Sequence, residues 1–216
     1  MTARNRPTPV FHFTHVNHLA TLVQHGLLCD SEAHEAGVLT AEVGNLGIKD
    51  QRRQRAVPLQ PGGAVADYVP FYFAPRSPMM YAIAHGNVPS YQGGTARIIY
   101  LVSTLERLHE LGRFPLLTDR NAALNYADYR TFDPVDPIDD DFIDWGLMAA
   151  QYWNNTPDDP QRRERRMAEA LVSERVSWDA ITGIGTQNEI VANEVRAILA
   201  AVDSNTSVNV RPQWYF

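Results

Sequence analysis

The chain has 216 residues, enough to bury a sizeable core, and we expect one domain spanning residues 1–216. Hydrophobic residues make up 44% and charged residues 20% of the sequence, as in an ordinary globular protein, and no apolar run approaches the roughly 20 residues of a membrane helix. The formal net charge of −6 argues mildly against a protein that binds nucleic acid through its overall charge.

The first 55 residues predict a strand followed by helices. The N-terminus lacks the apolar segment of a signal peptide, so export is not expected. Residues 10–14 alternate apolar and polar side chains, which predicts a strand, and Asn17 can cap a helix that Gly26 closes. Cys29 is the sole cysteine, which excludes an internal disulfide and fits a reducing, cytoplasmic location. Residues 48–55 are polar and basic and predict a short helix.

Residues 67–81 combine three prolines with several aromatic side chains. The β-prone run 69–73 contains Pro70, which cannot donate to a ladder, so we expect an edge or irregular strand. Ser77 and Pro78 suit the N-cap and first residue of a helix that reaches Ala84. The stretch is either a rigid aromatic corner of the core or a pocket wall for a flat ligand, and composition alone favours the corner.

The remaining chain mixes strands and helices without regular alternation. The predicted strands cover residues 96–102, 114–118 and, as an edge strand, 208–216. The predicted helices cover residues 104–112, 144–153, 162–168 and 187–202. Residues 169–172 suit either the continuation of a helix or the start of a strand. We therefore expect the α+β class with antiparallel pairing.

A few residues carry candidate chemistry. His12 and Thr14 share one face of the first strand and can line a pocket, although a single strand histidine is more often structural. Glu169 stands among small and apolar neighbours, where a carboxylate is either paired or functional. The basic run 52–55 suits a pyrophosphate clamp or, more commonly, an exposed helix face. No metal-ligand spacing, nucleophile elbow, Walker loop or dinucleotide fingerprint occurs, so no metal is expected and residues alone do not specify a reaction.

Six short motifs nevertheless follow one another in a specific order. They are His-Phe-Thr-His at 12–15, the basic stretch 48–55, the corner 67–79, Tyr-Gln-Gly-Gly at 91–94, Thr-Asp-Arg at 118–120 and Ala-Glu-Ala-Leu-Val at 168–172. Together they resemble the DarT family, which are DNA ADP-ribosyltransferase toxins of bacterial toxin–antitoxin pairs. The resemblance covers nearly the whole chain and implies an ADP-ribosyltransferase-like fold, with a central split antiparallel β core surrounded by helices.

The resemblance also implies an activity: transfer of ADP-ribose from NAD, as co-substrate, to a thymine base in single-stranded DNA within a short sequence context. It implies the catalytic residues Arg53 and Glu169. The NAD-binding residues that it implies are His12, Phe13, Thr14, Thr21, Cys29, Arg53 and Tyr68. For DNA it implies Tyr72, Arg76, Met79, Tyr91 and Gln92. Residues 34–53 would close over NAD, and residues 116–169, which include the acidic insertion 133–144, would address the DNA base.

The expected partners are single-stranded DNA and an antitoxin macrodomain protein, with no membrane and a monomeric chain. Two alternatives stay open at this point. One is transfer to another acceptor, such as guanine, RNA or a protein side chain. The other is a non-catalytic nucleotide- or nucleic-acid-binding module, in which Glu169 is the structural ion-pair partner of nearby arginines.

Overall fold

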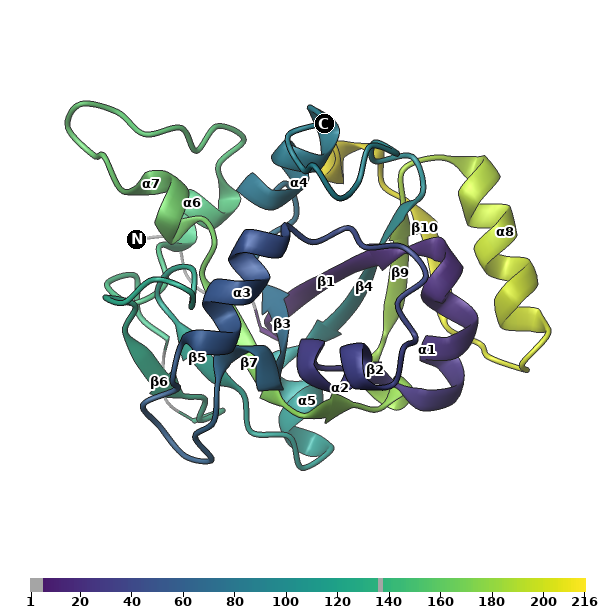
Figure 1. Ribbon diagram of the computed structural model, residues 1–216, viewed down its shortest axis with the longest axis horizontal. Coiled ribbons are helices and arrows are strands. Elements are labelled where there is room, and N and C mark those ends of the chain that lie inside the picture. Colours follow the sequence, from purple (N-terminus) through teal and green to yellow (C-terminus); the bar gives the residue numbers. More distant parts are fainter. Residues whose placement is uncertain (1–5, 136–137) are drawn as a thin grey trace.

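The computed structural model describes residues 6–135 and 138–216, which form a mostly antiparallel sheet flanked by helices (Figure 1). In the described chain this sheet has eight strands, in the order β10-β9-β4-β1-β3-β7-β5-β6, and only β9 and β10 pair in parallel. Its strands are β1 (Pro9–His15), β3 (Tyr68–Tyr72), β4 (Ile98–Thr104), β5 (Leu116–Thr118), β6 (Tyr129–Thr131), β7 (Glu169–Ser173), β9 (Gly183–Thr186) and β10 (Ser207–Val210). A separate two-stranded sheet joins β2 (Leu27–Leu28) to β8 (Arg175–Val176).

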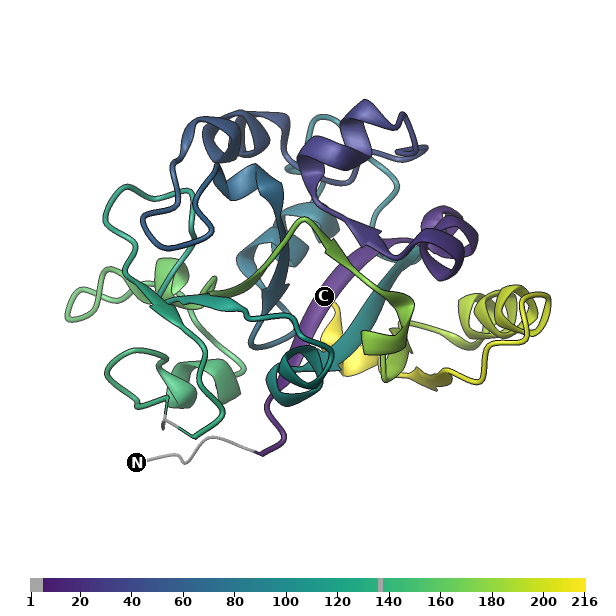
Figure 2. The same cartoon turned by 90° about the horizontal axis from the view of Figure 1, so that it is seen from below.

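Helices cover both faces of the large sheet. Figures 1 and 2 show α2 and α3 on one face and α5 on the other, with α8 at the β10 end. The α-helices are α1 (Leu19–His25), α2 (Asp30–Glu35), α3 (Leu46–Gln54), α4 (Pro78–Ala84), α5 (Leu105–Glu110), α6 (Trp145–Ala149), α7 (Arg162–Arg165) and α8 (Glu189–Ala200). Short 3-10 helices cover Val16–His18, Val65–Asp67, Trp178–Ala180 and Pro212–Trp214. None of the helices that the described residues form has the length and apolarity that a membrane crossing requires.

The sheet is split between β1 and β3. These two strands pair at the single position Phe11 with Tyr72, whereas β1 runs alongside β4 over its whole length. On the other side of the split, β3 pairs with β7 at five consecutive positions, from Tyr68 with Ser173 to Tyr72 with Glu169. The predicted α+β class and split antiparallel core are confirmed.

Residues 69–73 were predicted to form an edge or irregular strand. The edge alternative was wrong, because β3 lies inside the sheet, but its pairing with β1 is irregular and limited to one position. The backbone oxygen of Pro70 accepts a hydrogen bond from His12 Nδ1 at 2.8 Å, so this residue's main-chain polar groups face β1. The missing N–H of Pro70 therefore falls on the split side, where no ladder is present. Proline is tolerated at an interior position because the neighbouring strand has separated.

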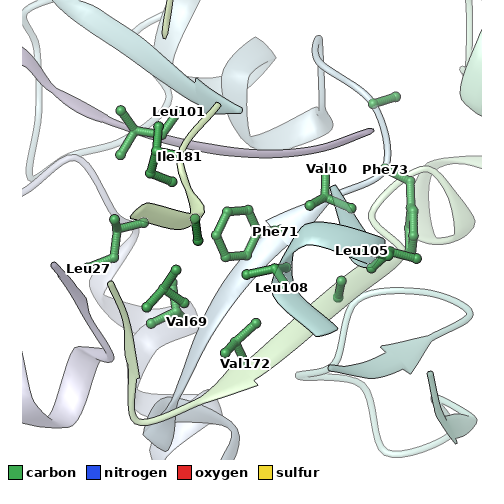
Figure 3. Packing of buried hydrophobic residues seen from close by; sticks show 14 of the residues in the cluster. Val10, Leu27, Val69, Phe71, Phe73, Leu101, Leu105, Leu108, Val172 and Ile181 are labelled. Atoms are coloured by element: carbon green, nitrogen blue, oxygen red, sulfur yellow. The ribbon is translucent and has the colours of Figure 1, made fainter. Parts of the chain in front are cut away.

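Alternation along β3 divides its side chains between two surroundings. Val69, Phe71 and Phe73 join the main hydrophobic core, whereas Tyr68, Pro70 and Tyr72 face the opposite side. Figure 3 shows the Phe71 ring at the centre of that core, with leucines of α5 and aliphatic side chains of neighbouring strands around it. This strand is thus fixed from behind by apolar burial, at roughly 1.5–3 kcal/mol for each large side chain.

Residues 169–172, which the sequence left open between helix and strand, form β7. The preceding helix α7 ends at Arg165, and the predicted helix 144–153 is shorter as well, ending at Ala149. The buried guanidinium of Arg166 explains the second boundary, because it donates to the carbonyl oxygens of Leu147, Met148 and Ala150 at the end of α6. A side chain that satisfies the terminal carbonyls ends a helix as a C-cap does.

The C-terminal segment closes the sheet with aromatic side chains. Strand β10 is an edge strand, as predicted, but the residues after it leave the sheet. The Tyr215 hydroxyl lies 3.0 Å from the carbonyl oxygens of both Ile98 and Gly185, and the Trp214 ring lies directly over Gly185. A Cβ atom built on Gly185 would come within 2.3 Å of that ring. Glycine is required here by close approach.

We therefore expect Gly185→Ala to lower the free energy of unfolding by about 1–3 kcal/mol, as overpacking usually does. Gly47→Ala is the matched control, since a Cβ there meets only the Asn45 side chain at 3.3 Å and an alanine favours the helix α3. Urea denaturation of both variants measures the effect. A Gly185→Ala protein as stable as the wild type would contradict this account of the C-terminal packing.

Candidate functional site

The split in the sheet opens into a cavity of about 410 Å³, within the usual range for a small-molecule site. Strand β1 forms one wall, β3 and the start of β7 form the other, and α4 contributes Pro78, Met79 and Ala82. The roof consists of residues 39–45 and α3, which Figure 1 shows lying across β3. The cavity thus lies where backbone pairing between β1 and β3 has been lost.

Glu169, the first residue of β7, provides the buried carboxylate of the cavity. Its side chain is 1% exposed, and its backbone is fixed from both sides by pairing with Thr118 of β5 and Tyr72 of β3. The amide of Ala122 donates to its Oε2 at 3.3 Å, and the Thr118 hydroxyl accepts from its amide at 3.1 Å. A carboxylate buried this deeply needs a cationic partner.

Arg52 of α3 is that partner. Its Nη1 donates to both carboxylate oxygens of Glu169, at 2.9 and 3.0 Å. Burial would lower the pKa of Arg52, but the nearby Glu169 and Tyr72 outweigh it, and the pKa stands above its ordinary value. Its buried Nη2 has no hydrogen-bond partner in the described part of the chain. Arg52 itself lines the cavity, and its Nη2 is a buried donor that the described residues leave unsatisfied.

Helix α3 is held over the cavity by polar contacts, since none of its residues is buried. Lys49 pairs with Asp30 of α2 and with Glu42 of the roof, both at 2.6 Å. Arg53 pairs with Asp30 and Asp50, both at 2.8 Å. Asp30 itself lines the cavity, so Arg53 stands at the rim, while Arg52 points inward. Partly exposed ion pairs contribute little each, so α3 is bound far less firmly than the strands beneath it.

Strand β1 presents the His12 ring and the Thr14 hydroxyl to the cavity. Because a carbonyl oxygen only accepts, the bond to Pro70 places the proton of His12 on Nδ1 and leaves Nε2 as an acceptor. Burial lowers the pKa of His12, so its imidazole is neutral at neutral pH. The Thr14 hydroxyl lies 2.9 Å from Nδ1 of His18. These side chains offer a ligand both an acceptor and a hydroxyl group.

Aromatic side chains line the cavity between the two strands. The rings of Phe13 and Tyr72 stack across the split, with centroids 6.1 Å apart and an interplanar angle of 14°. Burial and the charge of Glu169 raise the pKa of Tyr72, so its phenol stays protonated beside the carboxylate. Tyr68 is tied by its hydroxyl to the Gly62 carbonyl at 2.6 Å. Flat apolar surfaces of this kind suit stacking on a ring.

The structure brings about half of the predicted site residues together. Those that line the cavity are His12, Phe13, Thr14, Tyr68, Tyr72, Met79 and Glu169. Those outside its lining are Thr21, Cys29, Arg53, Arg76, Tyr91 and Gln92. Cys29 is buried and binds through its backbone amide to the Glu174 carbonyl, while its two chain neighbours line the cavity.

Three predicted DNA-binding side chains make internal contacts. Arg76 donates to the Tyr215 carbonyl and lies 4.1 Å from the Phe216 ring centre. Tyr91 contacts the ring of His15 edge-on, and Gln92 Nε2 donates to the carbonyl oxygens of Gly86 and Val88. Their roles toward DNA stay predictions.

Sequence reasoning missed several residues that line the cavity. They include His18, Lys49, Arg52, Asn121, Arg163 and Met167. Arg52 was part of the recognised basic run, but only the phase of the short helix α3 decides which arginine faces inward. Met167 and Arg163 lie two and six residues before Glu169. Their closeness to Glu169 in the sequence was a signal, but it did not show whether their side chains face the cavity. Among the residues the structure describes, no group of three or more His, Cys, Asp or Glu side chains is arranged to hold a metal ion.

Comparison with known proteins gives one consistent match. Residues 11–216 match the family model described as ssDNA thymidine ADP-ribosyltransferase, DarT. A DNA ADP-ribosyl transferase of Thermus sp. strain 2.9 is 36% identical over 213 residues, covering 97% of both chains. The DNA ADP-ribosyl transferase of Mycobacterium tuberculosis is 32% identical over 219 residues, covering 99% of this chain and 92% of the relative.

Solved structures agree with the sequence comparison. The Thermus sp. 2.9 DarT in complex with ADP-ribosylated single-stranded DNA superposes with a TM-score of 0.87 at 33% identity, covering 100% of this chain and 99% of that one. The same Thermus protein in complex with NAD+ gives a TM-score of 0.82, covering 98% and 99%. The Thermosipho africanus DarTG in complex with ADP-ribose, at 20% identity and a TM-score of 0.76, shares the fold and is covered over 51% of its length.

Proposed function

The chain belongs to the DarT family of single-stranded-DNA thymidine ADP-ribosyltransferases, and we propose that its cavity binds NAD with the nicotinamide-bearing ribose beside Glu169. It is a NAD-dependent DNA ADP-ribosyltransferase that releases nicotinamide. The observation that carries the residue assignment is the buried Glu169–Arg52 pair at the split, with one Arg52 donor still unpartnered. The pair belongs to the cavity lining, and a purely structural buried ion pair would normally have all of its donors satisfied.

Glu169 stabilises the charge that develops on the ribose. Breaking the bond between ribose C1′ and the nicotinamide nitrogen sends its electron pair to the nicotinamide and leaves positive character on the sugar, as in glycoside cleavage. A carboxylate held by Thr118 and Tyr72 through its backbone is preorganised to accept a ribose hydroxyl and to oppose that charge. Arg52 donates to both oxygens of this carboxylate and so fixes it in one rotamer.

Arg53 serves the acceptor side. The new bond joins ribose C1′ to a thymine ring nitrogen, which gives up its proton to solvent as the bond forms. An arginine is permanently charged in proteins and makes a poor proton acceptor. We therefore assign Arg53 an electrostatic role: from the cavity rim beside Asp30 it attracts the pyrophosphate and the nitrogen as the nitrogen loses its proton.

Single-stranded DNA reaches the cavity mouth beside α7. Arg163 of α7 lines the cavity, and its guanidinium makes no hydrogen bond or ion pair to another described residue. Tyr72 and Met79 supply apolar surface inside, where a stacked base is worth roughly 1–3 kcal/mol. Arg76, Tyr91 and Gln92 are proposed to border the DNA path on the α4 side. Local positive charge at the mouth serves a polyanion despite the net charge of −6.

We also propose a biological setting. The family resemblance supports a toxin that is controlled by an antitoxin macrodomain protein, and the single cysteine supports a reducing, cytoplasmic location. The site is built within one chain, which supports a monomer as the active form.

Glu169→Gln tests the assignment with the smallest structural change, because Glu169→Ala would leave a buried arginine unpaired at a cost of about 3–5 kcal/mol. We expect Glu169→Gln to lower transfer of labelled ADP-ribose to thymine-containing oligonucleotides by about 10²–10³-fold, since an electrostatic group at the reaction centre is lost. NAD affinity, measured by calorimetry, changes much less.

The matched control is Glu174→Gln, an exposed glutamate just beyond the other end of β7, which leaves transfer unchanged. Oligonucleotides without thymine, RNA and protein substrates accompany the assay to detect other acceptors. Binding of NAD without transfer to any DNA by the wild-type chain would overturn the proposed reaction.

Arg53→Lys and Arg53→Ala distinguish charge from proton transfer. We expect single-turnover transfer by Arg53→Lys to exceed that by Arg53→Ala by at least about tenfold, because lysine keeps the positive charge at the rim. Arg107→Ala, on α5 at the opposite face, is the control. Equal, near-complete loss in both Arg53 variants would instead support a specific proton-transfer role.

Expression of the chain in a bacterial host is expected to slow growth, because modified thymines block copying of DNA. Co-expression of a macrodomain protein that removes ADP-ribose from DNA restores growth, and Glu169→Gln removes the toxicity. Growth curves with quantification of modified DNA check this. Toxicity that persists in Glu169→Gln would show a cause other than ADP-ribosylation.

A further inference from the structure

His18 occupies a position that the reaction does not explain. It is the last residue of the 3-10 helix that follows β1, it is 7% exposed, and it lines the cavity. Its Nε2 accepts hydrogen bonds from the backbone amides of Thr40 and Ala41, at 3.2 and 3.1 Å. One imidazole nitrogen thus receives two amides from the segment that roofs the cavity.

These contacts define the protonation state of the ring. An amide N–H only donates, so Nε2 carries no proton, and in the neutral ring the proton sits on Nδ1. Nδ1 therefore donates to the Thr14 hydroxyl oxygen at 2.9 Å. The hydroxyl proton of Thr14 is then free to point toward an acceptor in the cavity. His18 therefore bonds at one nitrogen to the Thr14 hydroxyl in the cavity wall and at the other to the roof segment.

The roof segment, residues 38–45, has few other attachments. Six of its residues line the cavity, namely Leu39, Ala41, Glu42, Val43, Gly44 and Asn45. Beyond His18, Val43 packs against the hydrophobic cluster that contains Tyr100, the Gly44 carbonyl accepts from the Ser90 hydroxyl at 2.7 Å, and Glu42 pairs with Lys49. All three attachments lie in the C-terminal half of the segment. The two bonds to His18 hold its N-terminal half, together with the weak 3.4 Å bond from Val38 to the Ala33 carbonyl.

We propose that His18 is a positioning residue that holds residues 38–45 closed over bound NAD and orients the Thr14 hydroxyl, and that protonation of its Nε2 releases the segment. A protonated imidazole carries a proton on both nitrogens and can only donate. Its Nε2–H would then point at the two roof amides, which are donors as well, and both hydrogen bonds would be lost. The inference rests on the proposed NAD-binding function of the cavity.

The charges around His18 set the direction of the pH effect. Burial lowers the pKa of His18 below its ordinary value, and His15 and Lys49 lower it further, whereas Glu42 raises it. His12 lies close enough on β1 to interact as well. Since the closed form requires the neutral ring, closure is complete above the ordinary histidine pKa of about 6.5 and is lost as pH falls through the lowered value.

Two substitutions separate the two bonds of His18. In His18→Gln the amide oxygen stands near the position of Nε2 and accepts from the roof without titrating. In His18→Asn the shorter side chain reaches Thr14 and not the roof. NAD dissociation constants from calorimetry between pH 5.5 and 8.0 compare both variants with the wild type and with His25→Gln, an exposed histidine at the end of α1.

We expect the affinity of the wild type and of His25→Gln for NAD to fall at least about threefold between pH 7.5 and 5.5. Uptake of one proton can change a dissociation constant by at most about tenfold per pH unit, so this change is within the allowed range. His18→Gln stays within about twofold across that range, and His18→Asn binds NAD several-fold more weakly even at pH 8.0. Transfer at saturating NAD changes less than affinity in both variants.

Retention of the wild-type acid loss by His18→Gln, or wild-type affinity in His18→Asn at pH 8.0, overturns the inference. If neither variant folds, hydrogen exchange of the wild-type Thr40 and Ala41 amides decides: their protection must fall with protonation of His18, measured on the same sample by NMR. A wild-type chain that binds NAD as described but modifies no DNA contradicts the proposed reaction and leaves this result standing.

Discussion

The separation of β1 from β3 is the constraint on which the site depends. A continuous sheet would fill this space with backbone hydrogen bonds, and the side chains of both strands would pack against one another. Pro70 lacks the N–H that a full ladder needs, and its carbonyl is satisfied by the His12 ring. The two strands are nevertheless held in register by Phe11 with Tyr72 and by the core behind Phe71. Pro70 therefore both removes a backbone hydrogen bond between the strands and fixes the tautomer of His12.

The two sides of the cavity are stabilised by different forces. Behind it, buried apolar side chains of β3, β4 and α5 form one continuous core, as Figure 3 shows. Above it, α3 buries no residue and is attached through the charges of Lys49, Arg52 and Arg53. Apolar burial gives rigidity, whereas exchangeable polar contacts permit a roof to open. A co-substrate that must enter, react and leave as two products needs this combination of a fixed floor and a weakly attached roof.

Much of the fold was readable from the sequence, because strand alternation and helix caps are local. Ser77 caps α4 as predicted, and the strand predicted at residues 96–102 forms as the buried strand β4 at residues 98–104. The cap predicted at Asn17 was wrong, because Asn17 lies within a 3-10 helix and α1 begins at Leu19 without a side-chain cap. The interior position of Pro70 was missed because its tolerance depends on a strand 58 residues away.

The site was only half readable for the same reason. Family motifs identified Glu169 and the β1 residues, but long-range contacts determine which arginine of the basic run meets Glu169. No local pattern marks His18, because its partners come from a segment without periodicity, 22 and 23 residues away. Conversely, Arg76 and Gln92 look like ligand-binding side chains in the sequence and make internal contacts in the fold.

The neighbouring arginines of α3 show why two cations of the same type take different roles. Arg52 contacts a carboxylate that is 1% exposed, so its charge offsets a desolvation cost and cannot be given up without destabilising the floor of the cavity. Arg53 contacts carboxylates at the rim, where water screens each pair and exchange of partners costs little. An incoming pyrophosphate can therefore take Arg53 from Asp30 far more readily than it can take Arg52 from Glu169. Burial thus separates the two arginines: the inner one is committed to the Glu169 carboxylate, and the outer one is free to take the role toward substrates that is proposed for it.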